Sequence, residues 1–382
     1  MTVHDQQPLR GMTWRHVRGE APLIEAGRQT GVAVEWEARS LADFEDVPIA
    51  DLAAEYDLIA IDHPHVGQAA ASGALLALDE VLEPAVLAEH RANVVGVGAG
   101  SYEYAGHQWA VAMDAAVQVS AWVPDRLDQP PGEWNAVIDL LRDSTRGVHA
   151  TMPANPTHLF SSFISLCHDS ASEVQRLAAD DQRPAWWPSA GLDAEVAATA
   201  WERLRELVDL LDPRSLQMNP IDLLDEMSSG GPADYAPLIF GYSNYARPGF
   251  AEVCVRFGDA PGSAGTMTGG VGLAISGRCQ DQQSAIRLLS HVISADFQAS
   301  SYGLSGGQPA HRKAWLDERL NEVSSNFFVD TLSTVDNGFL RGRDDRYPTF
   351  QRDVGNLLHD QLRLRRPAAA VIADINQRWR QR

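Results

Sequence analysis

Lysine is almost absent from this sequence of 382 residues: Lys313 is the single one, and every other residue of the Lys/Arg pair is arginine. Enzymes that form a Schiff base with a carbonyl substrate or with pyridoxal phosphate need a lysine whose pKa is lowered by burial. Lys313 lies in the polar stretch HRKAW, where we expect an exposed side chain. The sequence therefore argues against both kinds of lysine chemistry.

Basic charge of any kind is also scarce. Lysine and arginine together number 31 against 51 aspartates and glutamates, which gives a net charge of −20. A protein that binds nucleic acid needs a basic surface to neutralise phosphates, and the sequence shows no basic stripe. We therefore expect no nucleic-acid partner.

Cysteines and long apolar runs are few. Cys167, Cys254 and Cys279 are widely spaced and form no C-x-x-C pair, so we expect small buried side chains and not disulfides or a zinc ribbon. No apolar run approaches the ~18 residues that cross a membrane, which predicts no membrane insertion. The start MTVHDQQPLRGMTWRHVRGE lacks the apolar core of a secretory signal. With Met1 as the native start, we expect a cytoplasmic protein.

What the sequence does contain is a regular alternation of strand and helix patterns. Residues 8–14, 32–40 and 57–62 have the apolar pattern of strands, and residues 19–31 and 41–56 have that of helices. A β-α-β-α-β series of this kind predicts an α/β fold with parallel strands.

Two further stretches carry weaker signals. Residues 170–200 are poor in apolar side chains, and we expect this stretch, including Trp186 and Trp187, to form a surface excursion. The glycine-rich stretch VVGVGAGSYEYAG does not have the spacing of the dinucleotide fingerprint. We therefore expect no organic cofactor.

A dense polar cluster follows the third expected strand, at Asp62-His63-Pro64-His65. Four roles are open for it: metal ligation, acid/base catalysis by an imidazole that Asp62 orients, hydrogen bonding to a polar ligand, and structural packing. Metal ligation is the less favoured role, because it needs at least one more ligand and supporting groups around it.

A second cluster follows the first expected strand. Trp14, His16 and Arg18 alternate, so their side chains could project together towards a ligand. A tryptophan face stacks on a sugar ring, and an arginine fork binds a carboxylate or phosphate. The plain alternative is that Trp14 packs a loop and Arg18 is a surface charge.

A third cluster, in FLRGRDDRYPTF, contains Arg341, Arg343 and Tyr347. In so acidic a chain, two neighbouring arginines suggest recognition of an anionic ligand group. A salt-bridge network between helices explains the same residues equally well.

Four segments point to a known family. They are HQWAVAMDAAVQVSAWVPDRL, PPGEWNAVIDLLRD, TGGVGLAISGRCQDQQSAIRLLSHVIS and ASSYGLSGGQPAHRKAW. In this order they resemble the hinge strand, the Pro-x-x-Trp helix start, the return into the first lobe, and the glycine-proline loop near the ligand of sugar-type solute-binding proteins of ABC importers. The resemblance, to the maltose-binding-protein-like family, spans roughly residues 9–379.

The resemblance implies an α/β architecture, the periplasmic-binding-protein-like fold. This fold has two α/β lobes with a hinge and a ligand cleft between them. Lobe 1 would comprise residues 1–112 and 250–300, and lobe 2 residues 113–249. Residues 301–382 would form a helical segment that packs on both lobes. Ligands of open α/β sheets bind beyond the carboxyl ends of strands, which places the first two polar clusters at the cleft.

The resemblance also adds candidates near the expected hinge. Asp114 would accept sugar hydroxyls or merely cap backbone N–H groups. The loop FGYSNYARPG would line the cleft or form a rigid hinge packed by tyrosines, and paired glycines would let backbone N–H groups approach a ligand. The expected ligand-binding residues are Trp14, His16, Arg18, Asp62, His63, His65, Asp114, Tyr242, Asn244, Tyr245, Arg247, Gly269 and Gly270.

The leading interpretation is a protein that binds a small polar, hydroxylated ligand such as a sugar or sugar acid. The alternative is a cytoplasmic enzyme on the same fold, in which Asp62, His63 and His65 carry out proton-transfer chemistry without a cofactor. A signalling or sensor subunit is a third open class. The family is exported, so the missing export signal makes a transporter partner doubtful.

Overall fold

The computed structural model describes residues 7–40, 47–179, 182–262 and 264–382. The chain divides into two compact units. Unit 1 comprises Met1–Ala115, Gly269–Leu320 and Arg343–Asp345, and unit 2 comprises Ala116–Thr268, Asn321–Gly342 and Arg346–Arg382. The chain thus changes unit after residues 115 and 268, where the sequence analysis placed these changes after residues 112 and 249. The segment from residue 301 onward is shared between the units.

Unit 1 is built on a five-stranded sheet with the order β2-β1-β3-β11-β6. Its N-terminal strands are β1 Leu9–Trp14, β2 Val34–Arg39 and β3 Leu58–Asp62, as the sequence predicted. β1 is parallel to β2 and β3, because a helix crosses over between consecutive strands. β11 (Val271–Ile275) is antiparallel both to β3 and to β6 (Val111–Ala112).

The position of each strand in this sheet explains its sequence. β3 lies in the centre and is buried along almost its whole length, which is why it reads as the continuous apolar run LIAID. β2 lies at the edge and alternates between exposed and half-buried positions. The first crossover helix, α1 (Val17–Thr30), ends at Gly31, whose φ of +68° is the left-handed conformation that suits glycine at a helix end.

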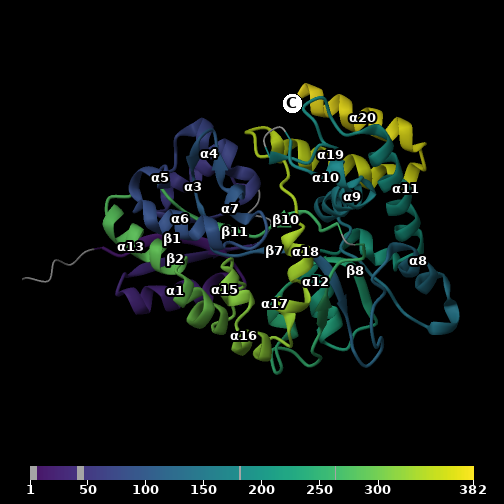
Figure 1. The fold of residues 1–382 in the computed structure, drawn as a ribbon, viewed down its shortest axis with the longest axis horizontal. Helices are drawn as coiled ribbons and strands as arrows, with labels where there is room; N and C mark the ends of the chain where they lie inside the picture. The colour runs from purple at the N-terminus through teal and green to yellow at the C-terminus, as the bar shows by residue number, and fades with distance from the viewer. Residues whose placement is uncertain (1–6, 41–46, 180–181, 263) are drawn as a thin grey trace, which may run out of the picture. The chain divides into compact units, whose positions relative to one another are not determined.

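Helices cover the sheet of unit 1. α1 packs against α13 (Gln282–Val292), so two helices far apart in sequence lie side by side (Figure 1). α3 (Ile49–Glu55) corresponds to the second half of the helix expected at residues 41–56. Residues 41–46 of that expected helix lie outside the described residues. The remaining elements are α3 Ile49–Glu55, α4 Val66–Ser72, α5 Leu78–Val81, α6 Pro84–Asn93, α7 Gly98–Ser101, β4 Glu103–Tyr104, β5 His107–Gln108, α14 Ala295–Phe297, a π-turn at Gln298–Tyr302, α15 Arg312–Trp315 and α16 Glu318–Val323, which ends in unit 2.

Unit 2 contains a second, smaller sheet. Its strands are β7 Ala116–Trp122, β8 Tyr235–Phe240, β9 Arg256–Gly258 and β10 Thr268–Gly269. β7 is antiparallel to both β8 and β9. On the other side of β8, Ala150 pairs with Tyr235 in parallel, and the N–H of Thr151 donates to the Tyr235 carbonyl at 2.9 Å.

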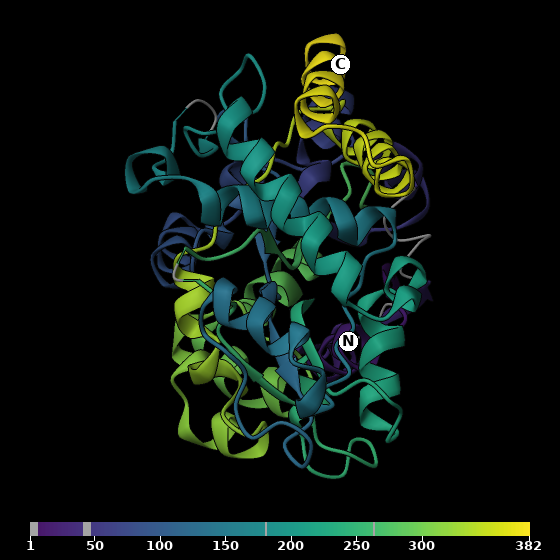
Figure 2. The same ribbon diagram turned by 90° about the vertical axis from the view of Figure 1, so that its right-hand side faces the viewer.

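The helices of unit 2 enclose one apolar core. α9 (Pro156–Ser170) packs against α11 (Ala194–Leu210) and α19 (Tyr347–Leu364), and it is buried from His158 to His168 (Figure 2, where α19 and α20 are yellow). A helix covered on several sides has no polar face to present to water. The others are α8 Trp134–Arg142, α10 Glu173–Arg176, α12 Pro220–Ser228, α17 Phe327–Asp330, α18 Leu332–Asp336 and α20 Ala368–Gln381, with 3-10 turns at Ser144–Arg146 and Pro213–Gln217.

The expected surface excursion around Trp186 and Trp187 is a wrong prediction. Both indoles are fully buried and belong to the core of unit 2. Their rings stack with a centroid distance of 5.7 Å, and Trp187 lies 5.2 Å from the ring of Trp379 in α20. Arg183 donates to the Trp187 carbonyl and lies over the Trp379 ring. The polar neighbours hid the burial, because the C-terminal helix that covers the pair lies almost two hundred residues away.

The expectations for the scarce residue types can also be compared with the structure. Lys313 is exposed, as predicted, and its Nζ pairs with Asp296 at 2.7 Å. Cys167 and Cys279 are buried free thiols, whereas Cys254 is only half-buried. Over the described residues, no helix is both long and apolar enough to cross a membrane.

Candidate functional site

Four chain segments enter or leave the sheet of unit 1 at the same edge. β1 and β3 are parallel neighbours, so their carboxyl ends, Trp14 and Asp62, lie at the same edge. β11 is antiparallel to β3 with Val271 opposite Asp62, which brings Gly270 to this edge. β6 is antiparallel to β11, so Asp114, two residues beyond β6, also follows a strand end there. The topology therefore brings together four groups of predicted residues from distant parts of the chain.

The most strongly bound group at this edge is the pair of Arg18 and Asp114. Nε and Nη2 of Arg18 donate to Oδ2 and Oδ1 of Asp114 at 2.6 and 2.5 Å, in a bidentate arrangement. The side chains are 4% and 0% exposed. Burial raises the pKa of Asp114, and the Arg18 guanidinium acts in the opposite direction. Arg18 belongs to α1, which follows β1, and Asp114 belongs to the segment that follows β6. The pair therefore connects the ends of two strands that are separated in the sheet by β3 and β11.

This pairing corrects two expectations. Arg18 is not a surface charge, and its fork is filled by the chain's own carboxylate. Asp114 was expected to accept either ligand hydroxyls or backbone N–H groups, and both of its oxygens instead accept from Arg18. In this structure the pair links α1 to the segment that follows β6.

Trp14, His16 and Arg18, which were expected to project together after the first strand, lie in three different local structures. β1 ends at Trp14 and α1 begins at Val17, so His16 occupies the helix N-cap. Its Nδ1 accepts from the N–H of Arg18 at 3.1 Å. Burial, and then the Arg18 charge, lower the pKa of His16 to about 4. His16 is therefore a neutral cap at physiological pH, and Trp14 is buried beside it.

The cluster Asp62-His63-Pro64-His65 forms a 3-10 turn at the end of β3. Oδ1 of Asp62 accepts from the N–H of His63 at 2.9 Å, and Nδ1 of His65 lies 3.2 Å from Oε1 of Gln68 in α4. Both imidazoles are buried. Within the described ranges, no group of three or more His, Cys, Asp and Glu side chains is placed to hold a metal ion. The turn thus presents two packed imidazoles at the sheet edge.

Gly270 brings two backbone segments into contact at the same edge. Its φ is +109°, and a Cβ there would lie 2.4 Å from the carbonyl oxygen of Asp114. Asp114 and Val271 exchange backbone hydrogen bonds at 3.1 and 3.2 Å. The close approach that suggested a ligand therefore occurs with the chain's own backbone. Gly269 precedes it at the end of β10 and is half-buried.

In unit 2, the predicted tyrosine-rich loop follows the carboxyl end of β8. It forms a 3-10 turn at Ser243–Ala246. The Tyr245 hydroxyl donates to Oδ1 of Asp225 at 2.7 Å, and burial together with this bond raises the pKa of Tyr245. Tyr242 packs edge-on against Tyr245 at 6.4 Å. Asn244 is buried and Arg247 is half-buried in the same turn.

The third predicted cluster is divided between the two units. Arg343 belongs to unit 1, where its Nη1 donates to the carbonyls of Gly100 and Glu103. Arg341 belongs to unit 2, where its Nη1 donates to Oε1 of Gln351 in α19 at 2.8 Å. Tyr347 is buried at the start of α19. The two arginines thus have separate partners in separate units.

The structure reveals one candidate that the sequence analysis missed, His158 in the first turn of α9. It is 7% exposed, and its Nδ1 has no hydrogen-bond partner among the described residues. Its ring packs edge-on against Phe240 at the end of β8, with a centroid distance of 6.1 Å. Burial, and then the charge of Arg341, lower the pKa of His158 to about 4. The sequence signal was the capped helix start Asn155-Pro156, which locates the first turn.

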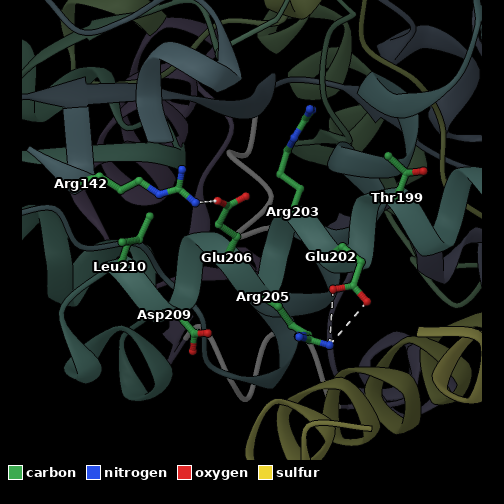
Figure 3. A pocket seen from close by; sticks show the side chains of 8 residues that line it. All are labelled: Arg142, Thr199, Glu202, Arg203, Arg205, Glu206, Asp209 and Leu210. Carbon is green, nitrogen blue, oxygen red and sulfur yellow. Dashed lines mark hydrogen bonds and ion pairs between the residues drawn. The ribbon is translucent and has the colours of Figure 1, made fainter. Parts of the chain in front are cut away.

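A surface hollow of about 580 Å³ along α11 has a different character. Figure 3 shows that arginine and acidic side chains dominate its lining, and that two ion pairs form among them. Arg142 pairs with Glu206, and Arg205 pairs with Glu202 at 3.4 Å. Because its charges are satisfied by neighbours on the same surface, this hollow has the properties of a solvated helix face.

Comparison with known proteins gives a match in structure alone. No family model matches the sequence, and no curated protein matches it. A tagatose-bound ABC transporter solute-binding protein of Thermotoga lettingae matches with a TM-score of 0.78 at 14% identity, over 98% of this chain and 100% of that chain. Maltose-bound MalE of T. maritima gives 0.77 at 14%, over 98% and 99%. A ribitol-bound solute-binding protein of Agrobacterium radiobacter gives 0.72 at 15%, over 98% and 100%. This chain therefore has the periplasmic-binding-protein-like fold of sugar-binding ABC transporter proteins, as its sequence resemblance predicted.

Proposed function

We propose that this protein binds a small carbohydrate-type ligand, a sugar, a polyol or a close derivative. The observation that carries the proposal is that four predicted segments meet at the carboxyl-end edge of the unit 1 sheet. Ligands of open α/β sheets bind beyond the carboxyl ends of the strands. The match to proteins solved with tagatose, maltose and ribitol, over nearly the whole chain, supports the same class of ligand.

Binding is favoured over catalysis for this site. In the enzyme interpretation, Asp62 would orient an imidazole for proton transfer. In the structure, the Asp62 carboxylate accepts from the backbone N–H of His63, which is a capping role. The structural neighbours named above are binding proteins. Asp62, His63 and His65 are accordingly proposed as ligand-contacting or packing groups of a binding site.

The expected hinge and inter-lobe cleft belong to this proposal, as do the ligand contacts of Trp14, Tyr242, Asn244, Tyr245 and Arg247. The cytoplasmic location also stays a prediction. Cell fractionation tests it, because recovery of the protein outside the cytoplasmic membrane would contradict it. The same result would favour a transporter partner, which the sequence analysis regarded as doubtful.

The proposal is tested by measuring thermal stability with tagatose, maltose and ribitol as probes, followed by calorimetry and product analysis. A ligand that binds only the folded state adds about 2.7 kcal/mol of stability at a concentration one hundred times its Kd. We expect at least one probe, or a near relative of it, to raise the melting temperature and to be recovered unchanged. Failure of all neutral and acidic sugars to bind would overturn the proposal, and turnover of a probe would favour the enzyme alternative.

A further inference from the structure

His90, in the last turn of α6 in unit 1, is a buried imidazole outside the proposed site. Its side chain is 1% exposed, and both of its ring nitrogens lack a hydrogen-bond partner among the described residues. A neutral imidazole has one N–H donor and one acceptor, so burial leaves both of them unsatisfied. An imidazolium ion at the same position would lose its hydration without gaining a partner. The burial of His90 therefore favours its neutral form.

The surroundings of His90 join α6 to the segment before α15. His311, in that segment, pairs with Val94 through its backbone, and its Nε2 lies 2.9 Å from Oε1 of Glu89. Because Glu89 and Val94 lie on either side of His90 in the chain, His311 lies against the end of α6 that carries His90. Burial, and then the charges of His311 and Arg91, lower the pKa of His90 to about 3. The neighbouring helix α7 has the sequence GAGS and adds no charge.

The same segment reaches the edge of the sheet where the candidate site lies. The N–H of Val95 donates to the carbonyl of Ala310 at 2.9 Å, and the N–H of Ala310 donates to the carbonyl of Met113 at 3.3 Å. Next to these residues, Pro309 pairs with Asp114 through its backbone. Three backbone segments are therefore in contact, in order from the end of α6 to the segment that follows β6.

We propose that His90 is a pH-sensitive switch, whose protonation separates the end of α6 from residues 308–311 and so loosens the sheet edge of the candidate site. The inference rests on the proposed function for this last step and names a regulation of that site. In the open form the imidazole is solvated and has its ordinary pKa of about 6.5, whereas the closed form resists protonation. The closed form is therefore favoured above about pH 6.5, and the open form gains population as the pH falls below it. From about pH 7.5 to about pH 5 the gain is roughly 30-fold.

Hydrogen exchange of the native protein at about pH 7.5 and about pH 5, corrected for intrinsic exchange rates, tests the switch without a ligand. The N–H groups of Val95 and Ala310 report on the contacts of α6. The N–H of Ser276 is the reference, because it donates to the Asp57 carbonyl at the other end of β11. We expect protection of the first two to fall by roughly 30-fold and that of Ser276 by less than about threefold. In His90→Phe, which does not titrate, all three should change by less than about threefold.

Two further variants support the interpretation. His90→Gln also stays neutral at both pH values, and it gives the same comparison if the phenylalanine variant folds poorly. His158→Gln is the matched control, because it removes another buried imidazole, from unit 2, and should leave the fall at Val95 and Ala310 in place. A fall that persists in His90→Phe, or that Ser276 shares in the unmodified protein, would overturn the switch.

Ligand binding separates the switch from the proposed function. A ligand that binds only the closed edge lowers the open population by about 100-fold at a concentration one hundred times its Kd. Bound tagatose, maltose or ribitol should therefore restore the protection of Val95 and Ala310 at about pH 5. A probe that binds without restoring it would overturn the link between switch and site. Binding of no probe would overturn the proposed function, while the exchange rates without ligand would still decide the switch.

Discussion

Arg18 in unit 1 and Arg341 in unit 2 are equally buried, at 4% exposure each, yet they have different partners. Arg18 is held by both oxygens of the buried Asp114. Arg341 donates to the neutral amide of Gln351 and lies close to a neutral imidazole, His158. Burial alone therefore does not tell what an arginine does, because the fold supplies a charged partner in one case and a neutral one in the other.

The difference follows from topology and not from residue type. Arg18 and Asp114 follow strands that end at the same edge of one sheet, so the fold delivers a carboxylate to the guanidinium. For Arg341, α19 supplies the amide oxygen of Gln351. The first contact joins two opposite charges, whereas the second joins a cation to a neutral amide.

The largest effect is expected from opening the pair in unit 1. Asp114→Ala leaves the Arg18 guanidinium buried beside no carboxylate, which costs about 3–5 kcal/mol in similar pairs. Chemical denaturation should show this loss in the free energy of unfolding, and Arg18→Met combined with Asp114→Leu should cost less than Asp114→Ala alone.

A matched control is the exposed pair of Lys313 and Asp296. Asp296→Ala removes an ion pair of similar length, but water already solvates both charges, so the expected loss is less than about 1 kcal/mol. A loss of the same size at both carboxylates would show that the buried pair has no special role.

The sequence predicted the strands and helices from residue 8 to residue 62 well, because their apolar periods of two and of 3.6 residues are local signals. It also named Arg18, after the first strand, and Asp114, near the expected hinge, as candidate site residues. It could not predict that they pair, since 96 residues separate them and the contact depends on the order of five strands. Trp186 and Trp187 were misjudged for the same reason, because the helix that buries them is remote in sequence.

The next effect concerns pH and His158. Its pKa is lowered from 6.5 to about 4 in the folded protein, first by burial and then by Arg341. The unfolded chain therefore binds the proton more tightly, so stability is full above about pH 6.5 and falls as the pH drops towards 4. The linked loss is about 3 kcal/mol at pH 4. Unfolding free energies measured across this range should fall less steeply for His158→Gln than for the unmodified protein.

Other buried histidines contribute in the same direction, since the pKa values of His16, His90 and His168 are also lowered. The comparison must therefore be made between variants at equal pH. In Arg341→Gln the pKa of His158 should rise, because one of its two causes is removed, and NMR titration of the ring proton measures this directly. An unchanged titration would contradict the proximity of Arg341 to His158.

A smaller effect is expected from Gly270→Ala. The residue adopts a φ of +109°, and the added Cβ would meet the carbonyl oxygen of Asp114 at 2.4 Å. Strain of this kind costs roughly 1–3 kcal/mol, and thermal denaturation should show a lower melting temperature. Gly230→Ala is the control, because it also has a positive φ of 77° but no atom near the new Cβ. Equal losses in both variants would assign the whole cost to the backbone conformation and none to the contact with Asp114.

The smallest effect is expected at a third arginine, Arg205 on α11. It pairs with Glu202 at 3.4 Å, one turn away on an exposed helix face. Pairs of this spacing stabilise a helix by about 0.2–0.5 kcal/mol, so Arg205→Ala should change the free energy of unfolding by no more than about 0.5 kcal/mol at moderate salt. A loss comparable to that of Asp114→Ala would mean that the contribution of an arginine to the free energy of unfolding does not depend on its burial and its partner. The contrast between Arg18 and Arg341 would then lose its physical basis.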